Sequence, residues 1–283
     1  MGKVRFEIVE HTFNKRKIAS CELSILLGMD SLVFMLVDAA GIQLIKDYQY
    51  DSRDWEELEG IFEGEKLLSE RYLRVKTAFL SPQQTLVPEP LYQEDKDRIY
   101  LEHLTDLSND AQLDTDYLPE VEAYSVYAYP HAWKEILEHH YEQYAVFHIS
   151  TPLIRTSREK IKGQPADGTS HMHIHVFDRL LQVLLWREDQ LCFVNTFPFG
   201  SARDFVYYVL LVIDQYDLDQ SETSVVVSGR IIKDSEVYQL LGRYLENINF
   251  ASAPGQPVMG QQLKIFPAHF YWDMLALGRT ETS

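Results

Sequence analysis

The chain has very few cysteines: only Cys21 and Cys192 among 283 residues. Two cysteines cannot form a disulfide framework or a zinc site built from cysteine ligands. Both lie in apolar stretches typical of strands, where a free cysteine behaves as a small buried hydrophobe. The chain must therefore gain its stability from an ordinary core, for which its 46% hydrophobic content is sufficient.

Long hydrophobic runs are also missing. Leu32–Val37, one of the longest, is far below the roughly 20 apolar residues that a membrane-spanning helix needs. The opening residues, MGKVRFEIVEH, contain no apolar stretch of the kind found in secretory signals. These features predict a cytoplasmic protein with no direct membrane insertion.

Basic residues are scarce compared with acidic ones. The chain has 26 Lys and Arg against 43 Asp and Glu, which gives a net charge of −17. Nucleic-acid binding depends on clustered basic side chains that neutralise phosphates, so no nucleic-acid partner is expected. Much of the acidic charge lies between Glu94 and Glu122. This segment is either a solvated surface or a docking face for a basic protein partner.

Several nucleotide-binding and catalytic motifs are absent. The chain contains neither G-x-G-x-x-G nor G-x-x-x-x-G-K-[ST], which excludes the Rossmann and P-loop patterns of phosphate binding. No serine lies in a G-x-S-x-G context, so no nucleophile elbow is present. Any chemistry must therefore come from a less common arrangement.

Apolar alternation and tight turns predict the same order of elements twice: three meandering strands, a helix, then another strand and helix. In the first half the predicted strands are Cys21–Leu27, Leu32–Val37, Ile42–Tyr50 and Arg71–Phe79. In the second half they are Met172–Phe177, Leu180–Trp186, Leu191–Phe197 and Thr223–Val227. Later predicted elements are a helix over Glu236–Asn247, a strand over Leu263–Phe266 and a helix over His269–Leu277. The predicted domains are residues 1–150 and 151–283, with a loop at 162–170 near the boundary.

This duplicated order resembles the actin-like ATPase superfamily, which includes actin and the sugar kinases. Arg187–Ser201 (REDQLCFVNTFPFGS) is similar to the hairpin, Pro-Phe-Gly turn and helix start of actin-like pilus-assembly proteins. Val225–Arg230 (VVVSGR) resembles the strand that faces adenosine, and Phe79–Tyr92 resembles an uncharacterised Bacteroidetes-type family. The resemblance implies an α/β, actin-like (ribonuclease H-like) fold. Each of its two subdomains would contain a mixed five-stranded sheet flanked by helices.

The residues that would bind phosphate depart from the superfamily pattern. ATPases of this fold use two Asp-x-Gly turns, in which glycine admits the phosphate to the backbone and aspartate holds Mg²⁺ through water. In the first turn Gly28 is present, but Leu26 replaces the aspartate. In the second turn His175 and Phe177 replace the aspartate and the glycine.

The adenosine-facing turn keeps Gly229 but has Arg230 at its second glycine position. An alignment shifted by one or two residues would bring Asp30 and Asp178 to the aspartate positions. The residues that would contact a nucleotide, if one binds, are therefore Gly28, Asp30, Asp178, Gly200 and Gly229.

Three alternating histidines, His171, His173 and His175, share one face of a predicted strand, with neighbours about 6–7 Å apart. Two such imidazoles can chelate a zinc ion, with a third ligand such as His148, His269 or a carboxylate. His173 and His175 are thus candidate metal ligands, and the alternative is a polar strand next to a loop.

The sequence leads to three hypotheses. The first is a non-catalytic actin-like scaffold that binds a protein partner and no cofactor. The second is a nucleotide-binding ATPase with altered phosphate loops, which would use ATP with Mg²⁺. The third is a metal-dependent enzyme that uses zinc at His171, His173 and His175.

Overall fold

The computed structural model describes residues 2–51, 54–162, 169–255 and 258–281, so most of the predicted loop at 162–170 lies outside the described residues. The chain divides into a first unit (Met1–Leu153, Gly255–Phe266 and Asp273–Ser283) and a second unit (Ile154–Pro254 and Pro267–Trp272). This division differs from the predicted 1–150 and 151–283. Two segments near the end of the chain make most of their contacts with the first unit.

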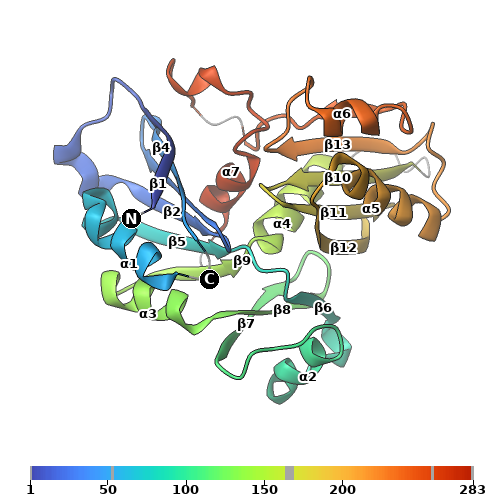
Figure 1. The fold of residues 1–283 in the computed structure, drawn as a ribbon, viewed down its shortest axis with the longest axis horizontal. Coiled ribbons are helices and arrows are strands. Elements are labelled where there is room, and N and C mark those ends of the chain that lie inside the picture. Colours follow the sequence, from blue (N-terminus) through green and yellow to red (C-terminus); the bar gives the residue numbers. More distant parts are fainter. Residues whose placement is uncertain (1, 52–53, 163–168, 256–257, 282–283) are drawn as a thin grey trace. The chain divides into compact units, whose positions relative to one another are not determined.

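The first unit contains a six-stranded sheet (Figure 1). Its strands, in spatial order, are β1 (Lys3–Val9), β4 (Gly41–Gln49), β3 (Ser31–Asp38), β2 (Glu22–Leu27), β5 (Arg74–Phe79) and β9 (Ala145–His148). The strands from β1 to β2 pair antiparallel, whereas β2, β5 and β9 run parallel. The sheet is therefore mixed, as predicted.

One face of this sheet forms the main core of the first unit. Alternate residues of β2 such as Leu23, Ile25 and Leu27 are fully buried and pack in the same cluster as residues of α1 (Trp55–Gly64) and α3 (His131–His140). The α1 helix begins where the Asp54 side chain accepts the Glu57 N–H, which is an ordinary N-cap. Alternation along the strand thus determines which side chains enter the core.

A small three-stranded sheet follows β5 within the first unit. Its order is β6 (Gln84–Pro88), β8 (Ala123–Pro130) and β7 (Ala111–Leu118), and α2 (Asp97–Glu102) is the helix of the same segment. The strand β6, which ends at Pro88, lies at the edge, which agrees with the limits that proline places on central strands. The acidic segment of the sequence is largely contained in this part.

The second unit contains a five-stranded mixed sheet (Figure 1). Its strands, in spatial order, are β12 (Gln190–Pro198), β11 (Leu180–Arg187), β10 (Ser170–Val176), β13 (Ser224–Gly229) and β14 (Ile248–Phe250). The apolar face packs in one cluster with residues of α5 (Ala202–Gln215) and α6 (Glu236–Leu241). The opposite face is more polar, because it presents His171, His173 and His175 of β10.

The two sheets repeat one topology. The order β4-β3-β2-β5-β9 in the first unit corresponds to β12-β11-β10-β13-β14 in the second, with the same parallel and antiparallel pairings. The predicted duplication of an α/β unit with a mixed five-stranded sheet is confirmed. The first sheet carries β1 in addition.

Two helices connect the units along the chain, α4 (Ser150–Ile161) and α7 (Trp272–Arg279). Most of α4 belongs to the second unit and most of α7 to the first. No helix in the described part of the chain is long and apolar enough to cross a membrane.

Some predicted elements were wrong in type or extent. Leu263–Phe266 is not a strand, because Leu263–Ile265 forms a short 3-10 helix whose first N–H is bound by the Glu10 carboxylate. The helix predicted over Glu236–Asn247 ends at Leu241, before Gly242. The edge strands β1 and β14 were not predicted.

Candidate functional site

Gly28 and Asp30 lie in the turn between β2 and β3. The Gly28 N–H donates to the Ser31 carbonyl at 2.8 Å, and the Gly28 carbonyl accepts the Tyr50 hydroxyl. A Cβ at Gly28 would lie 2.9 Å from Ser31 Oγ, so the turn leaves little room for a side chain. The Asp30 carbonyl accepts the Tyr50 N–H at 3.1 Å. The Gly28 N–H, the Gly28 carbonyl and the Asp30 carbonyl are thus already bonded within the first unit.

The turn between β10 and β11 in the second unit has the same construction. The Phe177 N–H donates to the Leu180 carbonyl at 2.8 Å, as Gly28 does to Ser31. Strand pairing therefore makes Phe177 the structural equivalent of Gly28, and His175 the equivalent of Leu26. A buried phenyl ring occupies the position where the first unit has a glycine.

Asp178, in this second turn, forms an ion pair with Arg230 at the end of β13. Arg230 Nη1 lies 2.5 Å from Asp178 Oδ1, and both side chains are partly buried. The Arg230 N–H also donates to the Val176 carbonyl at 2.7 Å. Two residues that the sequence placed in separate nucleotide motifs are thus joined directly. A carboxylate neutralised by a guanidinium fits poorly as a group that would hold hydrated Mg²⁺.

The two remaining predicted glycines have structural explanations. Gly229 has a φ of +85°, and a Cβ there would lie 2.1 Å from the Val176 carbonyl oxygen. Gly200 is exposed, and its N–H donates to the Asp204 side chain at 3.1 Å in the turn that starts α5. Gly229 is close to the Asp178–Arg230 pair in the chain, whereas Gly200 belongs to a helix start.

A buried serine lies between the two candidate metal ligands. His173 Nε2 and His175 Nδ1 each lie 2.7 Å from Ser228 Oγ. A hydroxyl has one proton, so it donates to one imidazole and accepts from the other. Burial, with a smaller contribution from neighbouring His175, lowers the pKa of His173 to about 3, so this ring is neutral at physiological pH.

The two histidines proposed as a third metal ligand each bond a main-chain carbonyl instead. His269 Nε2 lies 2.8 Å from the Ile231 carbonyl, and His148 Nε2 lies 2.9 Å from the Ser81 carbonyl within the first unit. No group of three or more His, Cys, Asp or Glu is arranged around a common point among the residues that the structure describes. The arrangement of His173 and His175 suits the serine hydroxyl that lies between them.

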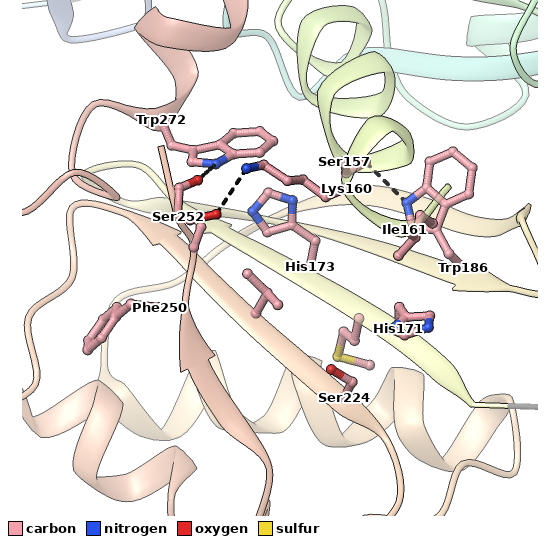
Figure 2. A pocket seen from close by; sticks show the side chains of 13 residues that line it. Ser157, Lys160, Ile161, His171, His173, Trp186, Ser224, Phe250, Ser252 and Trp272 are labelled. Carbon is pink, nitrogen blue, oxygen red and sulfur yellow. Dashed lines mark hydrogen bonds between the residues drawn. The ribbon is translucent and has the colours of Figure 1, made fainter. Parts of the chain in front are cut away.

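A cavity of about 350 Å³ opens on the polar face of the second unit's sheet (Figure 2). His173 lies within it, with its ring centroid 4.5 Å from that of Trp272 in an edge-to-face arrangement. Its 13 lining residues come from α4, the strands β10, β11, β13 and β14, the segment that follows β14, and the first residue of α7, Trp272. Strand alternation directs His171 and Trp186 to this face as well.

The sequence did not assign a role to several residues that contact the candidate histidines and Asp178 or that line the cavity. Ser228 lies near the end of β13 and Arg230 follows that strand, and only the parallel pairing of β10 with β13 brings them to His175 and Asp178. Lys160 and Trp272 come from segments far apart in the chain, and no motif connects them. Arg230, at the second glycine position of the adenosine-facing turn, was the one departure in the sequence that pointed to any of these residues.

Comparison with solved structures places the fold in a known class. A Bacteroides thetaiotaomicron protein with an actin-like ATPase fold and unknown function matches with a TM-score of 0.80 and 18% identity, covering 95% of this chain and 100% of that one. The PilM-PilN type IV pilus biogenesis complex matches with a TM-score of 0.57 and 14% identity, covering 90% of this chain and 97% of that one. The protein therefore has the actin-like ATPase fold.

The family is also defined. The model of the family described as "Protein of unknown function (DUF3822)" matches residues 10–248, and the chain belongs to this family. No curated protein matches the chain. At these identities the solved structures establish the fold alone.

Proposed function

We propose that this protein is a non-catalytic member of the actin-like fold, which acts by binding a protein partner and does not hydrolyse ATP. The observation that carries the proposal is the Asp178–Arg230 ion pair. It joins the turn that would bind phosphate to the strand end that would face adenosine. A carboxylate engaged in this way is a poor holder of Mg²⁺ and a poor means of orienting an attacking water.

The two hairpin turns support the same conclusion. Phosphate binding needs backbone N–H groups that point to the ligand without a side chain in the way. The Gly28 and Phe177 N–H groups each donate within their own hairpin instead. At the preceding motif position Leu26 has no carboxylate, and His175 is bonded to Ser228.

The proposed partner is a protein. The PilM-PilN structure, which shares the fold, is a complex. A surface that carries a net charge of −17 is unsuited to nucleic acid, and it suits a partner with basic groups. We place the protein in the cytoplasm, without direct membrane insertion.

Nucleotide binding and hydrolysis test the proposal. Isothermal titration calorimetry of the full chain with Mg-ATP and Mg-ADP should give no saturable binding up to about 1 mM, the upper end of ordinary KM values. Phosphate release should equal that of the Arg230→Ala and Asp178→Asn variants, because neither residue serves catalysis. Saturable Mg-ATP binding, or turnover that either variant abolishes, would instead support an ATPase that uses Asp178.

A further inference from the structure

The small three-stranded sheet of the first unit packs each of its faces against a different partner. Alternation along β8 sends Tyr127 and Tyr129 into the main core of the unit, and Val126 in the opposite direction. Val126 packs in a separate small core with Leu101, the buried residue of α2. The α2 helix therefore covers the face of the small sheet that lies away from the main core (Figure 1).

The same helix also carries large apolar side chains that face water. Ile99 is 48% exposed, and Leu104, which follows the end of the helix, is 66% exposed. The Leu104 N–H donates to the Leu101 carbonyl at 2.9 Å, so the turn continues as far as this residue. At about 100° per residue around the axis, Tyr100 lies about 100° and Leu104 about 140° from Ile99. Tyr100 thus lies between Ile99 and Leu104 on one flank of the helix.

A fourth residue, Leu91, is held beside this flank. The Tyr100 hydroxyl donates to the Leu91 carbonyl at 2.8 Å and accepts the Gln93 N–H at 3.0 Å, which ties the segment before α2 to the helix. Leu91 is 66% exposed. We call Leu91, Ile99, Tyr100 and Leu104 the α2 surface. Single exposed hydrophobic residues are common, but several large ones held together in this way are typical of an interaction site.

The α2 surface lies in a strongly acidic part of the chain. Residues 94–122 include ten Asp and Glu against two basic residues, which gives this segment a net charge of −8. One of the two basic residues, Arg98, is already bonded to the Glu102 carboxylate at 2.9 Å and to the Ser108 carbonyl at 3.3 Å. The exposed polar side chains next to the α2 surface in the chain are Glu94, Asp95, Glu102, His103 and Asp106. The apolar side chains are therefore bordered by net negative charge.

This charge decides which partner fits. A second copy of the chain would bring a net charge of −17 to a surface that is already acidic, so self-association through it is disfavoured. The apolar flank of one helix packs well against the apolar face of another, because their side-chain ridges and grooves interlock. Lys and Arg side chains at the edges of such a helix would complement the acidic border.

We propose that the α2 surface docks a basic amphipathic helix of a partner protein. The apolar face of that helix lies on Leu91, Ile99 and Leu104, and its basic side chains reach the acidic residues around them. This inference rests on the proposed partner-binding function, to which it adds a surface and a class of partner. The α2 helix and the small sheet contain none of the residues predicted to contact a nucleotide, so the two proposals can be tested separately.

Fluorescence anisotropy of the full chain with three labelled peptides tests the proposal. The first is a helix of about 18 Leu and Lys residues with one apolar face. The second has Glu in place of each Lys, and the third has the composition of the first in an order that forms no apolar face. The full chain should bind the first peptide saturably, the second not at all, and the third at least about 10-fold more weakly than the first.

Removal of the apolar side chains should have a large effect. Ile99→Gln combined with Leu104→Gln should weaken binding of the Leu–Lys peptide about 10-fold. Both side chains are exposed, so the variant should keep its fold, which circular dichroism checks. Tyr207→Gln combined with Leu211→Gln is the matched control, because it removes an exposed apolar pair from α5 in the second unit. This control should change the affinity less than about twofold.

Reversal of the acidic border tests the charge. Glu94→Lys combined with Asp95→Lys should weaken the Leu–Lys peptide about 10-fold in about 0.05 M salt, and less in about 0.5 M salt, where exposed charges are screened. Glu222→Lys combined with Glu246→Lys makes the same change in net charge on exposed residues of the second unit, and it should change the affinity less than about twofold.

Three results would overturn the docking surface: no saturable binding of the Leu–Lys peptide, equal binding of the Glu peptide, or equal affinities of an α2-surface variant and its matched control. None of them bears on nucleotide binding. Failure of the docking surface is therefore distinguishable from failure of the proposed scaffold function, which saturable Mg-ATP binding would reveal.

Discussion

In the first unit a glycine, Gly28, lies in the hairpin turn, and a phenylalanine, Phe79, lies at the end of the neighbouring parallel strand. In the second unit the equivalent positions are reversed, with Phe177 in the turn and Gly229 at the strand end. Each unit thus places one small and one large residue at the same two positions. The total side-chain volume at the two positions is therefore similar in both units. The backbone that has no side chain is the hairpin turn in the first unit and the strand end in the second.

The two sheets also differ on the face that is turned away from the hydrophobic core of each unit. In the first unit the Lys76 Nζ donates to the Gly278 carbonyl near the end of α7 at 2.6 Å. The equivalent residue in the second unit is Val226, which borders the cavity. A polar side chain that holds a helix has been replaced by an apolar one beside an open space. The units therefore share a scaffold but not a site.

The largest effect should come from Gly229→Ala. The positive φ and the 2.1 Å approach of a Cβ to the Val176 carbonyl oxygen would require backbone movement, with a loss of about 3 kcal/mol in unfolding free energy. Thermal and urea unfolding, followed by circular dichroism, measure it. Gly28→Ala is the matched control: it needs only a shift of the Ser31 hydroxyl and should cost about 1 kcal/mol. Equal losses in the two variants would mean that the backbone is equally constrained at the two glycines, and would contradict the expected difference between the units.

Lys76→Met should have the next largest effect. Lys76 is buried, and its ammonium lies between the Gly278 carbonyl and the Glu22 carboxylate, at 2.6 and 3.5 Å. The substitution leaves the carbonyl without this donor and should lower the free energy of unfolding by about 2 kcal/mol. Val226→Met at the equivalent position faces the cavity and should change stability by less than about 1 kcal/mol. A larger loss for Val226→Met would mean that the cavity tolerates no added volume.

A smaller effect is expected for the Asp178–Arg230 pair. Asp178→Asn and Arg230→Met should each lower the unfolding free energy by about 1.5 kcal/mol, since the pair is only partly buried. The double variant should lose less than the sum, with a coupling energy of about 1 kcal/mol. Additive losses would show that the two charges do not stabilise each other. The first unit offers no counterpart, because Met29 and Leu80 occupy the equivalent positions.

The hairpin strands of both units could be predicted because each carries a long apolar or alternating pattern between tight turns. The predicted Cys21–Leu27 and Met172–Phe177 differ from β2 and β10 by one or two residues at the ends. Edge elements were harder to predict. β14 has three residues, and the side chains of β1 are largely exposed or half-buried, so neither shows a strong apolar pattern.

The candidate site could be predicted only in part. The sequence pointed to His173, His175, Asp178 and Gly229, and the structure brings each near one of the others. The sequence suggested metal or nucleotide contacts for these residues because their actual hydrogen-bond and ion-pair partners could not be identified from it. Those partners, Ser228 and Arg230, become visible only when β10 and β13 are paired in register, because nothing local in the chain indicates a contact across 52 residues.

The smallest predicted effect is a difference in acid sensitivity between the units. Burial lowers the pKa of His173 to about 3, so in the second unit the unfolded chain takes up a proton near the ordinary histidine pKa of about 6.5 while the folded unit does not. Stability is therefore lost as the pH falls below about 6.5. At a pH of about 5.5 the loss from this group should be about 1 kcal/mol.

Opposing groups in the first unit should largely cancel. Burial lowers the pKa of His148 to about 4, which also removes stability on acidification. Asp116 accepts the Thr151 hydroxyl at 2.6 Å and the His148 N–H at 2.8 Å, yet its burial raises its pKa to about 7. The folded unit thus protonates Asp116 before the unfolded chain does, so this carboxyl adds stability as the pH falls from about 7 to about 4.

Hydrogen exchange measured by mass spectrometry at pH of about 7 and about 5.5, corrected for intrinsic rates, resolves the two units. Acidification should reduce the protection of β10 and β11 more than that of β2 and β3. His173→Gln can retain a hydrogen bond to Ser228 without titrating, so it should remove most of the difference. Asp116→Asn should have the opposite result, making the first unit more acid-sensitive by leaving His148 unopposed. Equal loss of protection by both units, in the original chain and in both variants, would show that these buried groups do not control acid sensitivity. The two units would then differ in their buried residues but not in their response to acid.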